Sequence, residues 1–154
     1  MRCIERLADL TNSVGEELAV SNWVLVDQDR IDRFAHATGD HQWIHVDPVR
    51  AAGGPFGATI AHGYLTLSML PLFVDDALRF EDVAMSVNYG LNRVRFMAPV
   101  LVGSELRARF RLKSLEPLPD SGMQMVLEAT IEKKGSEKPV CVAETVTRRY
   151  VRAH

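Results

Sequence analysis

The sequence has few cysteines and no excess of either charge. Its two cysteines, Cys3 and Cys141, lie far apart, and neither belongs to a Cys-x-x-Cys pair. This excludes a disulfide framework and a thiolate metal cluster, and predicts a protein of the reducing cytoplasm. Lysine and arginine number 18 against 20 acidic residues, a net charge of −2. Because there is no basic excess, no nucleic acid partner is expected.

The sequence also lacks a segment typical of secretion signals or membrane spans. The first ten residues, MRCIERLADL, carry charges throughout, so no secretion signal is predicted. The longest stretch without acidic residues, lysine or arginine runs from Ala51 to Val74. It contains several glycines, two prolines and His62, and its first half is typical of a loop. We therefore predict a loop followed by a buried core element, and no membrane association.

The chain has the size and composition of one globular domain. It contains 154 residues, of which 47% are hydrophobic and 25% charged. Domains most often have about 100–150 residues. No repeat, low-complexity tract or linker interrupts the sequence, so residues 1–154 are assigned to a single domain.

The first quarter of the chain predicts two helices around a strand. Apolar residues at helical spacing predict a helix from Ile4 to Val14. Residues Leu18 to Val26 predict a strand. A second helix has its apolar face on residues 31, 34, 35 and 38, with an N-cap at Asp27 or Asp29 and its end at Gly39.

One long segment, from Ala61 to Leu78, is apolar on almost every side of a helix. A helix at the surface would have a polar face, so this helix is expected to be surrounded by protein. Pro71 lies inside it and would kink it or split it into two.

After residue 80 the apolar pattern changes to strict alternation, which is typical of strands. Strands are predicted over Ala84–Phe96, residues 106–113, residues 125–132 and Val140–Val151, with a bulge at residues 88–90. An α+β fold satisfies this order of elements: an antiparallel sheet curls around one apolar helix and keeps its other face in water.

One predicted strand carries a stripe of basic side chains: Arg107, Arg109, Arg111 and Lys113. A stripe of this kind could bind phosphates or nucleic acid, but aromatic residues do not alternate with it. Cross-strand pairing with Glu128 and Glu132 on the next strand is the favoured interpretation.

Polar residues concentrate between Thr38 and Asp47, in a segment predicted to be irregular. His41 and His45 have the i, i+4 spacing of a metal site, but Gly39 precedes them and no third ligand is obvious, so no metal is expected. Asp40 and His45 could instead hold a water molecule and act as acid and base. A structural role, with Asp40 capping the backbone and His45 a satisfied loop side chain, is equally open at this point.

A second motif, Ile60 to Tyr64, begins the buried helix. The free N–H groups and the positive dipole end of a helix start suit a developing oxyanion. Gly63 has no side chain, so a ligand could approach its backbone closely. A helix start that uses glycine only for packing is the alternative.

Together the two motifs resemble the MaoC-like dehydratases, which include the R-specific enoyl-CoA hydratases. The resemblance rests on G-D-x-x-x-x-H at Gly39–His45, followed by A-H-G at Ala61–Gly63. Residues 88–103 are similar to the small, single-domain branch related to nodulation protein N. The resemblance extends from about Trp23 to Gly103. It implies the hot-dog fold, a curled antiparallel sheet wrapped around one long central helix.

The resemblance also implies an activity: R-specific hydration of trans-2-enoyl thioesters, or the reverse dehydration of 3-hydroxyacyl thioesters. Asp40 and His45 would activate water, and the Gly63 amide would bind the thioester oxygen. The substrate would be a thioester of CoA or of an acyl carrier protein, no further cofactor is expected, and the chain would form a homodimer. Substrate-binding roles are assigned to four further residues: Gln42, Trp43, His62 and Asn88.

Two other functions are compatible with the sequence. One is a non-catalytic acyl-thioester-binding or structural subunit of a hetero-oligomeric dehydratase, although such a subunit need not keep both Asp40 and His45. The other is a hot-dog thioesterase. Thioesterases of this fold usually carry a carboxylate on the central helix, and no carboxylate lies between His62 and Val74.

Overall fold

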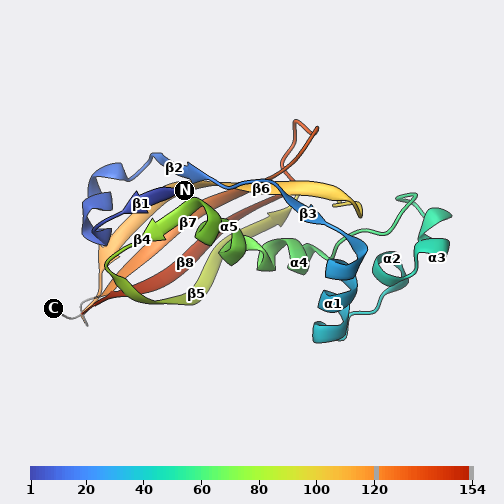
Figure 1. Ribbon diagram of the computed structural model, residues 1–154, viewed down its shortest axis with the longest axis horizontal. Helices are drawn as coiled ribbons and strands as arrows, with labels where there is room; N and C mark the ends of the chain where they lie inside the picture. Colours follow the sequence, from blue (N-terminus) through green and yellow to red (C-terminus); the bar gives the residue numbers. More distant parts are fainter. Residues whose placement is uncertain (120–121, 153–154) are drawn as a thin grey trace.

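A long antiparallel sheet forms the body of the molecule (Figure 1). The computed structural model describes residues 1–119 and 122–152. Within them, the sheet has the strand order β2-β6-β7-β8-β5, and β3 also pairs with β6. These pairings are all antiparallel, as the alternating sequence predicts. The strands are β2 (Glu17–Val20), β3 (Val24–Val26), β5 (Val83–Phe96), β6 (Ser104–Pro117), β7 (Gly122–Lys133) and β8 (Cys141–Val151).

The four strands predicted after residue 80 are confirmed. The register of β5 against β8 shifts between Asn88 and Gly90, at the predicted bulge. The strand predicted over residues 18–26 is instead divided into β2 and β3. The division falls at Ser21, whose hydroxyl accepts a hydrogen bond from the Ala108 N–H at 2.9 Å and so enters the ladder between them.

The basic stripe on β6 pairs with acidic side chains on the neighbouring strands. Arg107 Nε lies 2.7 Å from a carboxylate oxygen of Glu132, and Arg109 Nε lies 2.8 Å from one of Glu17. Lys113 lies 3.9 Å from Glu128. The cross-strand interpretation of the stripe is therefore confirmed.

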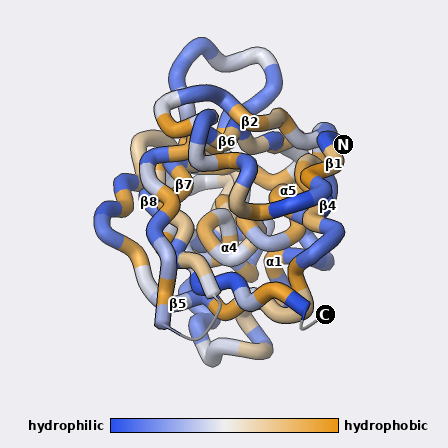
Figure 2. The backbone as a smooth tube through the Cα atoms, turned by 90° about the vertical axis from the view of Figure 1, so that its left-hand side faces the viewer, coloured by the Kyte–Doolittle hydropathy of each residue, from blue (hydrophilic) through white to orange (hydrophobic). Residues whose placement is uncertain are grey.

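The sheet curls around two short helices rather than one long helix. Viewed along the long axis of the molecule, β5, β8, β7 and β6 surround α4 (Gly63–Ser68) and α5 (Leu70–Ala77) (Figure 2). The central helix expected from the family resemblance is present but interrupted at Met69, and the split predicted from Pro71 is confirmed. Pro71 lies in the first turn of α5, where its missing N–H is tolerated, whereas inside a continuous helix that N–H would have to bond Leu67.

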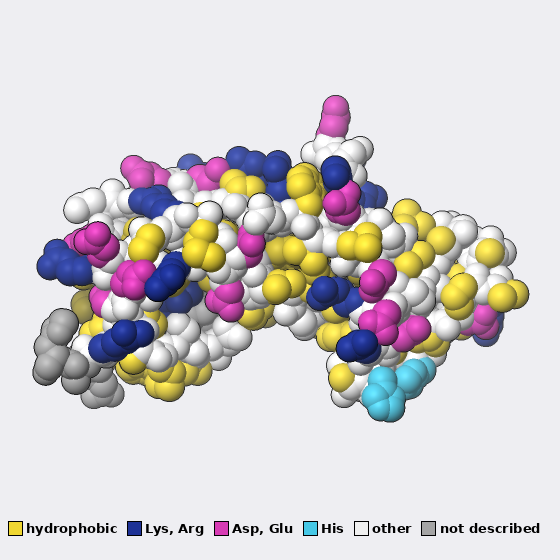
Figure 3. Space-filling view, in the orientation of Figure 1, with side chains coloured by type: hydrophobic (Ala, Val, Ile, Leu, Met, Phe, Trp, Pro, Cys, Tyr) yellow, Lys and Arg dark blue, Asp and Glu magenta, His cyan; other side chains and the backbone are white. Residues whose placement is uncertain are grey.

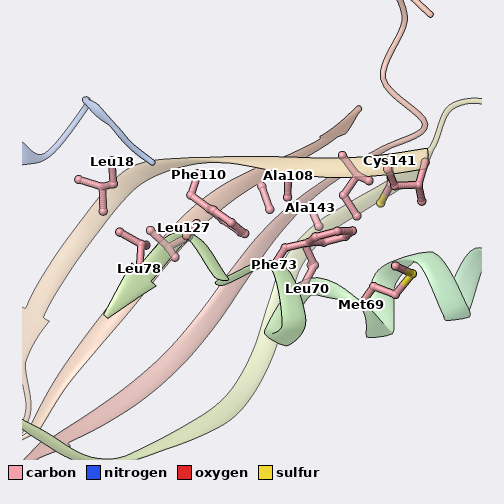
Figure 4. Packing of buried hydrophobic residues seen from close by; sticks show 14 of the residues in the cluster. Leu18, Met69, Leu70, Phe73, Leu78, Ala108, Phe110, Leu127, Cys141 and Ala143 are labelled. Carbon is pink, nitrogen blue, oxygen red and sulfur yellow. The ribbon is translucent and has the colours of Figure 1, made fainter. Parts of the chain in front are cut away.

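The hydrophobic core lies between these helices and the concave face of the sheet. Phe73 of α5 is fully buried and points toward Ala143 of β8, with Phe110 and Leu127 nearby (Figure 4). Ala108 and Ala143 are small, which leaves space for the two large aromatic rings. In contrast, Tyr64 is 69% exposed. The prediction that protein surrounds the helix on all sides is therefore wrong for the single chain.

The N-terminal segment differs from the predicted helix over Ile4–Val14. Residues of β1 (Arg2–Ile4) pair in parallel with β4 (Leu78–Phe80), so Ile4 belongs to a strand. A 3₁₀ helix, η1 (Leu7–Ser13), follows. It starts at Leu7 because the Leu7 N–H donates to the carboxylate of Asp82, at 3.0 and 3.1 Å from its two oxygens. Both cysteines are free, as predicted.

Three helices form a lobe beyond one end of the sheet (Figure 1): α1 (Gln28–Thr38), α2 (Trp43–Val46) and α3 (Pro48–Ala52). The Asp27 carboxylate caps α1 by accepting from the Arg30 N–H, and Gly39 ends the helix in the left-handed conformation, with φ of 80°. The turn at Gly39 directs the chain into Asp40. In the part of the chain that the structure describes, no helix is long and apolar enough to cross a membrane.

Removal of the Phe73 ring is expected to destabilise the fold strongly. Phe73→Ala should lower the free energy of unfolding by about 3–5 kcal/mol, because it leaves a cavity between α5 and the sheet. Urea denaturation at fixed protein concentration measures the change. Val49→Ala, at a side chain that is 88% exposed, is the control and should stay within about 0.5 kcal/mol of the parent. Equal losses in both variants would contradict this packing.

Candidate active site

Three side chains from separate segments meet where the lobe joins the sheet. Asp40 follows α1, His45 lies in α2, and His62 directly precedes α4. Each contributes an atom to a cluster whose atoms all lie within 4.8 Å of one another. Asp40 is exposed, whereas His45 and His62 are buried. Figure 3 agrees: the histidine side chains visible on that face lie at the lower edge of the lobe, away from the buried junction.

His45 is held by a hydrogen bond that fixes its tautomer. Its Nδ1 lies 2.6 Å from the carbonyl oxygen of Ile60. A carbonyl oxygen can only accept, so Nδ1 carries the proton and Nε2 keeps a free lone pair. The backbone supports this contact, because the Ile60 N–H donates to the carbonyl of Ile44 at 3.0 Å. The buried ring therefore presents a basic nitrogen in a defined direction.

The surroundings of His45 also favour its neutral form. Burial lowers the pKa of His45 below its ordinary value of 6.5, because the imidazolium would lose hydration. The hydrogen bond to Ile60 opposes this shift. Two smaller effects come from neighbouring side chains: His62 lowers the pKa of His45, and the Asp40 carboxylate raises it. The net direction is downward, so His45 is an uncharged base near neutral pH.

His62 supports both members of the predicted catalytic pair. Its ring stacks on the ring of His45, with the two centroids 3.8 Å apart. The ring of Phe34 is tilted relative to that of His62, with centroids 5.0 Å apart. Its Nε2–H donates to the backbone carbonyl of Asp40 at 2.9 Å. The Nδ1 atom is buried without a partner among the described residues. These contacts are those of a positioning residue, which orients the His45 ring and the Asp40 backbone.

Gly63 and His45 line the same cavity, of about 350 Å³. Gly63 is the first residue of α4, so its N–H has no acceptor within the helix. A Cβ at this position would lie 3.1 Å from the ring of Phe96, which also lines the cavity. Glycine therefore allows Phe96 to approach α4 closely, and the cavity brings a basic nitrogen and a free N–H donor together.

Sequence reasoning missed several residues of this cavity. Thr66 of α4 is buried and lines it, as do Phe96 and the segment from Met97 to Val100. Thr66 lies three residues after Gly63, on the same helix face, and this spacing could have identified it. The contribution of Phe96 depends on pairing between distant strands and has no local signal.

Three predicted substrate-binding residues lie away from this cavity. Gln42 is exposed at the N-terminus of α2. The guanidinium of Arg50 lies over the ring of Trp43, with its central carbon 4.4 Å from the centroid of that ring. Asn88 lies in the bulge of β5 and lines a second cavity, of about 600 Å³. Their roles in substrate binding stay predictions.

The i, i+4 histidine pair considered for metal binding does not form on one helix. His41 is exposed and precedes α2, whereas His45 is buried inside it. The cluster of Asp40, His45 and His62 is a different set. A carboxylate and two free imidazole lone pairs can accept hydrogen bonds from a water molecule or coordinate a cation.

Comparison with known proteins relates this geometry to a family. Residues 9–134 match the family described as the MaoC like domain. The chain is 50% identical to 3-hydroxyacyl-thioester dehydratase Z of Mycobacterium tuberculosis, over 96% of this chain and 98% of the relative. It is 46% identical to nodulation protein N of Rhizobium leguminosarum, over 92% of this chain and 89% of the relative.

Solved structures agree with the fold. A MaoC-like dehydratase from Rhodospirillum rubrum superimposes with a TM-score of 0.77 and 22% sequence identity, covering 97% of this chain and 99% of that one. The hot-dog architecture expected from the sequence is thus shown, with its central helix divided in two. By the match over most of its length and by these relatives, the chain belongs to the MaoC-like dehydratase family.

Proposed function

We propose that this protein is an R-specific enoyl-thioester hydratase, which also catalyses the reverse dehydration of 3-hydroxyacyl thioesters. One observation carries the proposal: a neutral His45, with Nε2 free, lies beside the Asp40 carboxylate and shares a cavity with the first N–H of α4. The name of the 50% identical relative, a 3-hydroxyacyl-thioester dehydratase, supports it. The R configuration follows from the family resemblance of the motifs.

Hydration begins with a water molecule held between Asp40 and His45. The carboxylate accepts one of its hydrogen bonds, and Nε2 of His45 accepts the other. The conjugated thioester makes C3 of the substrate electrophilic. His45 takes a proton from the water as its oxygen bonds to C3, and the electrons of the double bond move toward the thioester oxygen. The same site then returns a proton to C2.

The Gly63 amide stabilises the charge that develops on the thioester oxygen. Its N–H lies on the cavity that His45 lines and has no helical acceptor. In comparable sites the loss of one such donor costs about 3–4 kcal/mol of transition-state stabilisation. The ring of Phe96 packs against Gly63 and lines the same cavity, which limits the space for bulk water near this donor.

The substrate is a thioester of CoA or of an acyl carrier protein, and the reaction needs no further cofactor because water is the only co-reactant. A cytoplasmic location accompanies this proposal, since both cysteines are free thiols.

A homodimer forms along β5 in this proposal. β5 is an edge strand of the sheet, and it exposes apolar side chains along its length, among them Met85, Val87 and Tyr89. A hydrophobic patch lies on the lower edge of the body in Figure 3, where β5 runs in Figure 1. A long unpaired apolar edge favours association. A second copy would also cover Tyr64 of α4, which is exposed in the single chain.

Asp40→Asn is expected to reduce the hydration of crotonyl-CoA by about a hundredfold or more, because the neutral amide lacks the negative charge that holds the water beside His45 and offsets the charge on the protonated ring. Loss of absorbance from the conjugated thioester measures the rate. Asp47→Asn is the matched control: Asp47 caps α3, and asparagine caps a helix equally well. Treatment with a chelator should leave the parent rate unchanged. Equal rates in both variants, or no turnover by the parent at any acyl length, would overturn the proposal.

The pH dependence of kcat/KM reports the pKa of His45 in the free enzyme. Because burial disfavours the imidazolium, protonation occurs at lower pH than usual, and the neutral base persists down to that pH. Activity should therefore stay constant as pH falls toward 6.5 and decline only below it. Ring NMR signals of His45 should titrate with the same midpoint. A midpoint above 6.5 would contradict the neutral-base assignment.

The oligomeric state tests the proposed interface. Light scattering should give the parent twice the mass of one chain. Val87→Lys, which places a charge on the apolar edge, should shift the mass toward one chain. Val49→Lys on the exposed surface of α3 is the control and should remain dimeric. A monomeric parent that associates only with another MaoC-like chain would instead favour the hetero-oligomeric subunit.

A further inference from the structure

Arg149 of β8 is a buried cation with few partners. Its relative exposure is 6%, and burial lowers the pKa of its guanidinium to about 10. One nitrogen donates to the hydroxyl of Ser86 at 2.8 Å, and the group lies 4.1 Å from the ring of Phe80. Its Nε has no partner among the described residues, and no carboxylate there forms an ion pair with it. A cation in this state strongly favours a bound anion.

Arg149 lines the second cavity, together with its hydrogen-bond partner Ser86. One wall of this cavity is apolar and comes from Leu67, Leu70 and Val74 on the two central helices. The opposite wall comes from β8 and β5, where Thr145, Thr147 and Arg149 follow one another on the concave face of the sheet. The hydroxyls of both threonines face backbone carbonyls of β7. Arg149 therefore contributes the free donors of this wall.

The cavity runs beside the helices that begin at the candidate active site. Leu67, which lines it, directly follows Thr66 of the His45 cavity. Asp75 of α5 lies at the other end, beside Arg149. At 1.5 Å per residue, the distance along the helices from Gly63 to Asp75 is about 18 Å. A long acyl chain whose thioester lies at Gly63 would place its far end near Arg149.

The geometry points to a subsite for a carboxylate at the far end of the acyl chain, bound by Arg149 and Ser86. The inference rests on the proposed function, because that function places the thioester at Gly63. The preferred substrates are then long 2-enoyl thioesters that end in a carboxylate, rather than in a methyl group. An acyl carboxylate is favoured over a phosphate of the carrier, because the apolar wall of the cavity suits a hydrocarbon chain.

Asp75 is the group that would compete with such a substrate. Its carboxylate is exposed, lines the same end of the cavity and raises the pKa of Arg149, against the larger effect of burial. Asp75→Asn should therefore increase the preference for a terminal carboxylate. A preference that disappears in Asp75→Asn and persists without Arg149 would overturn the assignment.

The test compares trans-2-enoyl-CoA substrates of eight, twelve and sixteen carbons, each with a terminal methyl group or a terminal carboxylate. We expect the carboxylate to raise kcat/KM by about tenfold or more at the length that reaches Arg149. Arg149→Gln should abolish this preference and retain the hydration of crotonyl-CoA, which is too short to reach it. Arg149→Lys should keep part of the preference for a terminal carboxylate. It is the variant to measure if Arg149→Gln does not fold.

Two controls separate this inference from its alternatives. N-acetylcysteamine thioesters lack a phosphate, so the preference should persist with them; an Arg149 effect seen only with CoA thioesters would assign the residue to the carrier and overturn the proposal. If no enoyl thioester is turned over, calorimetry with saturated acyl-CoA ligands still tests the subsite. Equal affinity for both chain ends, or a dimer that dissociates in Arg149→Gln without any substrate preference, would also overturn it.

Discussion

The hydrogen bond from His45 to the carbonyl of Ile60 is the contact on which the site depends. It joins the lobe of α1–α3 to the segment that leads into α4, and that segment is in turn bound to the connection between β5 and β6 through the Ala61 N–H and the carbonyl of Val100. The same bond selects the tautomer of His45. One donor and one acceptor, both buried, therefore link the position of α2 to the choice of the ring nitrogen that stays free to accept a proton.

The stack of His45 on His62 adds to this arrangement. The stacked ring of His62 lowers the pKa of His45, so the stack supports the neutral state of His45 that burial already favours. His62 also bonds the backbone of Asp40, which is otherwise exposed to solvent. An exposed carboxylate and a buried imidazole thus remain close together, although their environments differ greatly.

Local signals predicted much of the fold. Asp27 and Gly39 bound α1 as expected, because a side-chain cap and a left-handed turn are local properties of the chain. The alternation after residue 80 predicted β5 to β8, and Pro71 predicted the split between α4 and α5. The N-terminal helix failed because Ile4 pairs with β4, a contact about 75 residues away that no local pattern reveals.

For the candidate site too, local motifs were predictive and long-range contacts were not. Two short motifs predict Asp40, His45 and Gly63 as site residues. The structure brings these motifs together, because Asp40 and His45 share one cluster and His45 and Gly63 line one cavity. The support given by His62 and the wall formed by Phe96 come from chain segments that meet only in the folded protein. The cavity that Asn88 lines has no local signal in the sequence, since it depends on the pairing of β5 with β8.

The break between α4 and α5 separates two tasks that a single rigid helix would combine. α4 carries Gly63 and Thr66 at the candidate active site, whereas α5 carries the residues that border the far part of the second cavity. The interruption at Met69 is short, because the Met69 N–H bonds the carbonyl of Leu65 and the Met69 carbonyl accepts from the Phe73 N–H. Under the proposed function, substitutions in α5 would alter the preferred length of the acyl chain, whereas substitutions in the first turn of α4 would alter the reaction itself.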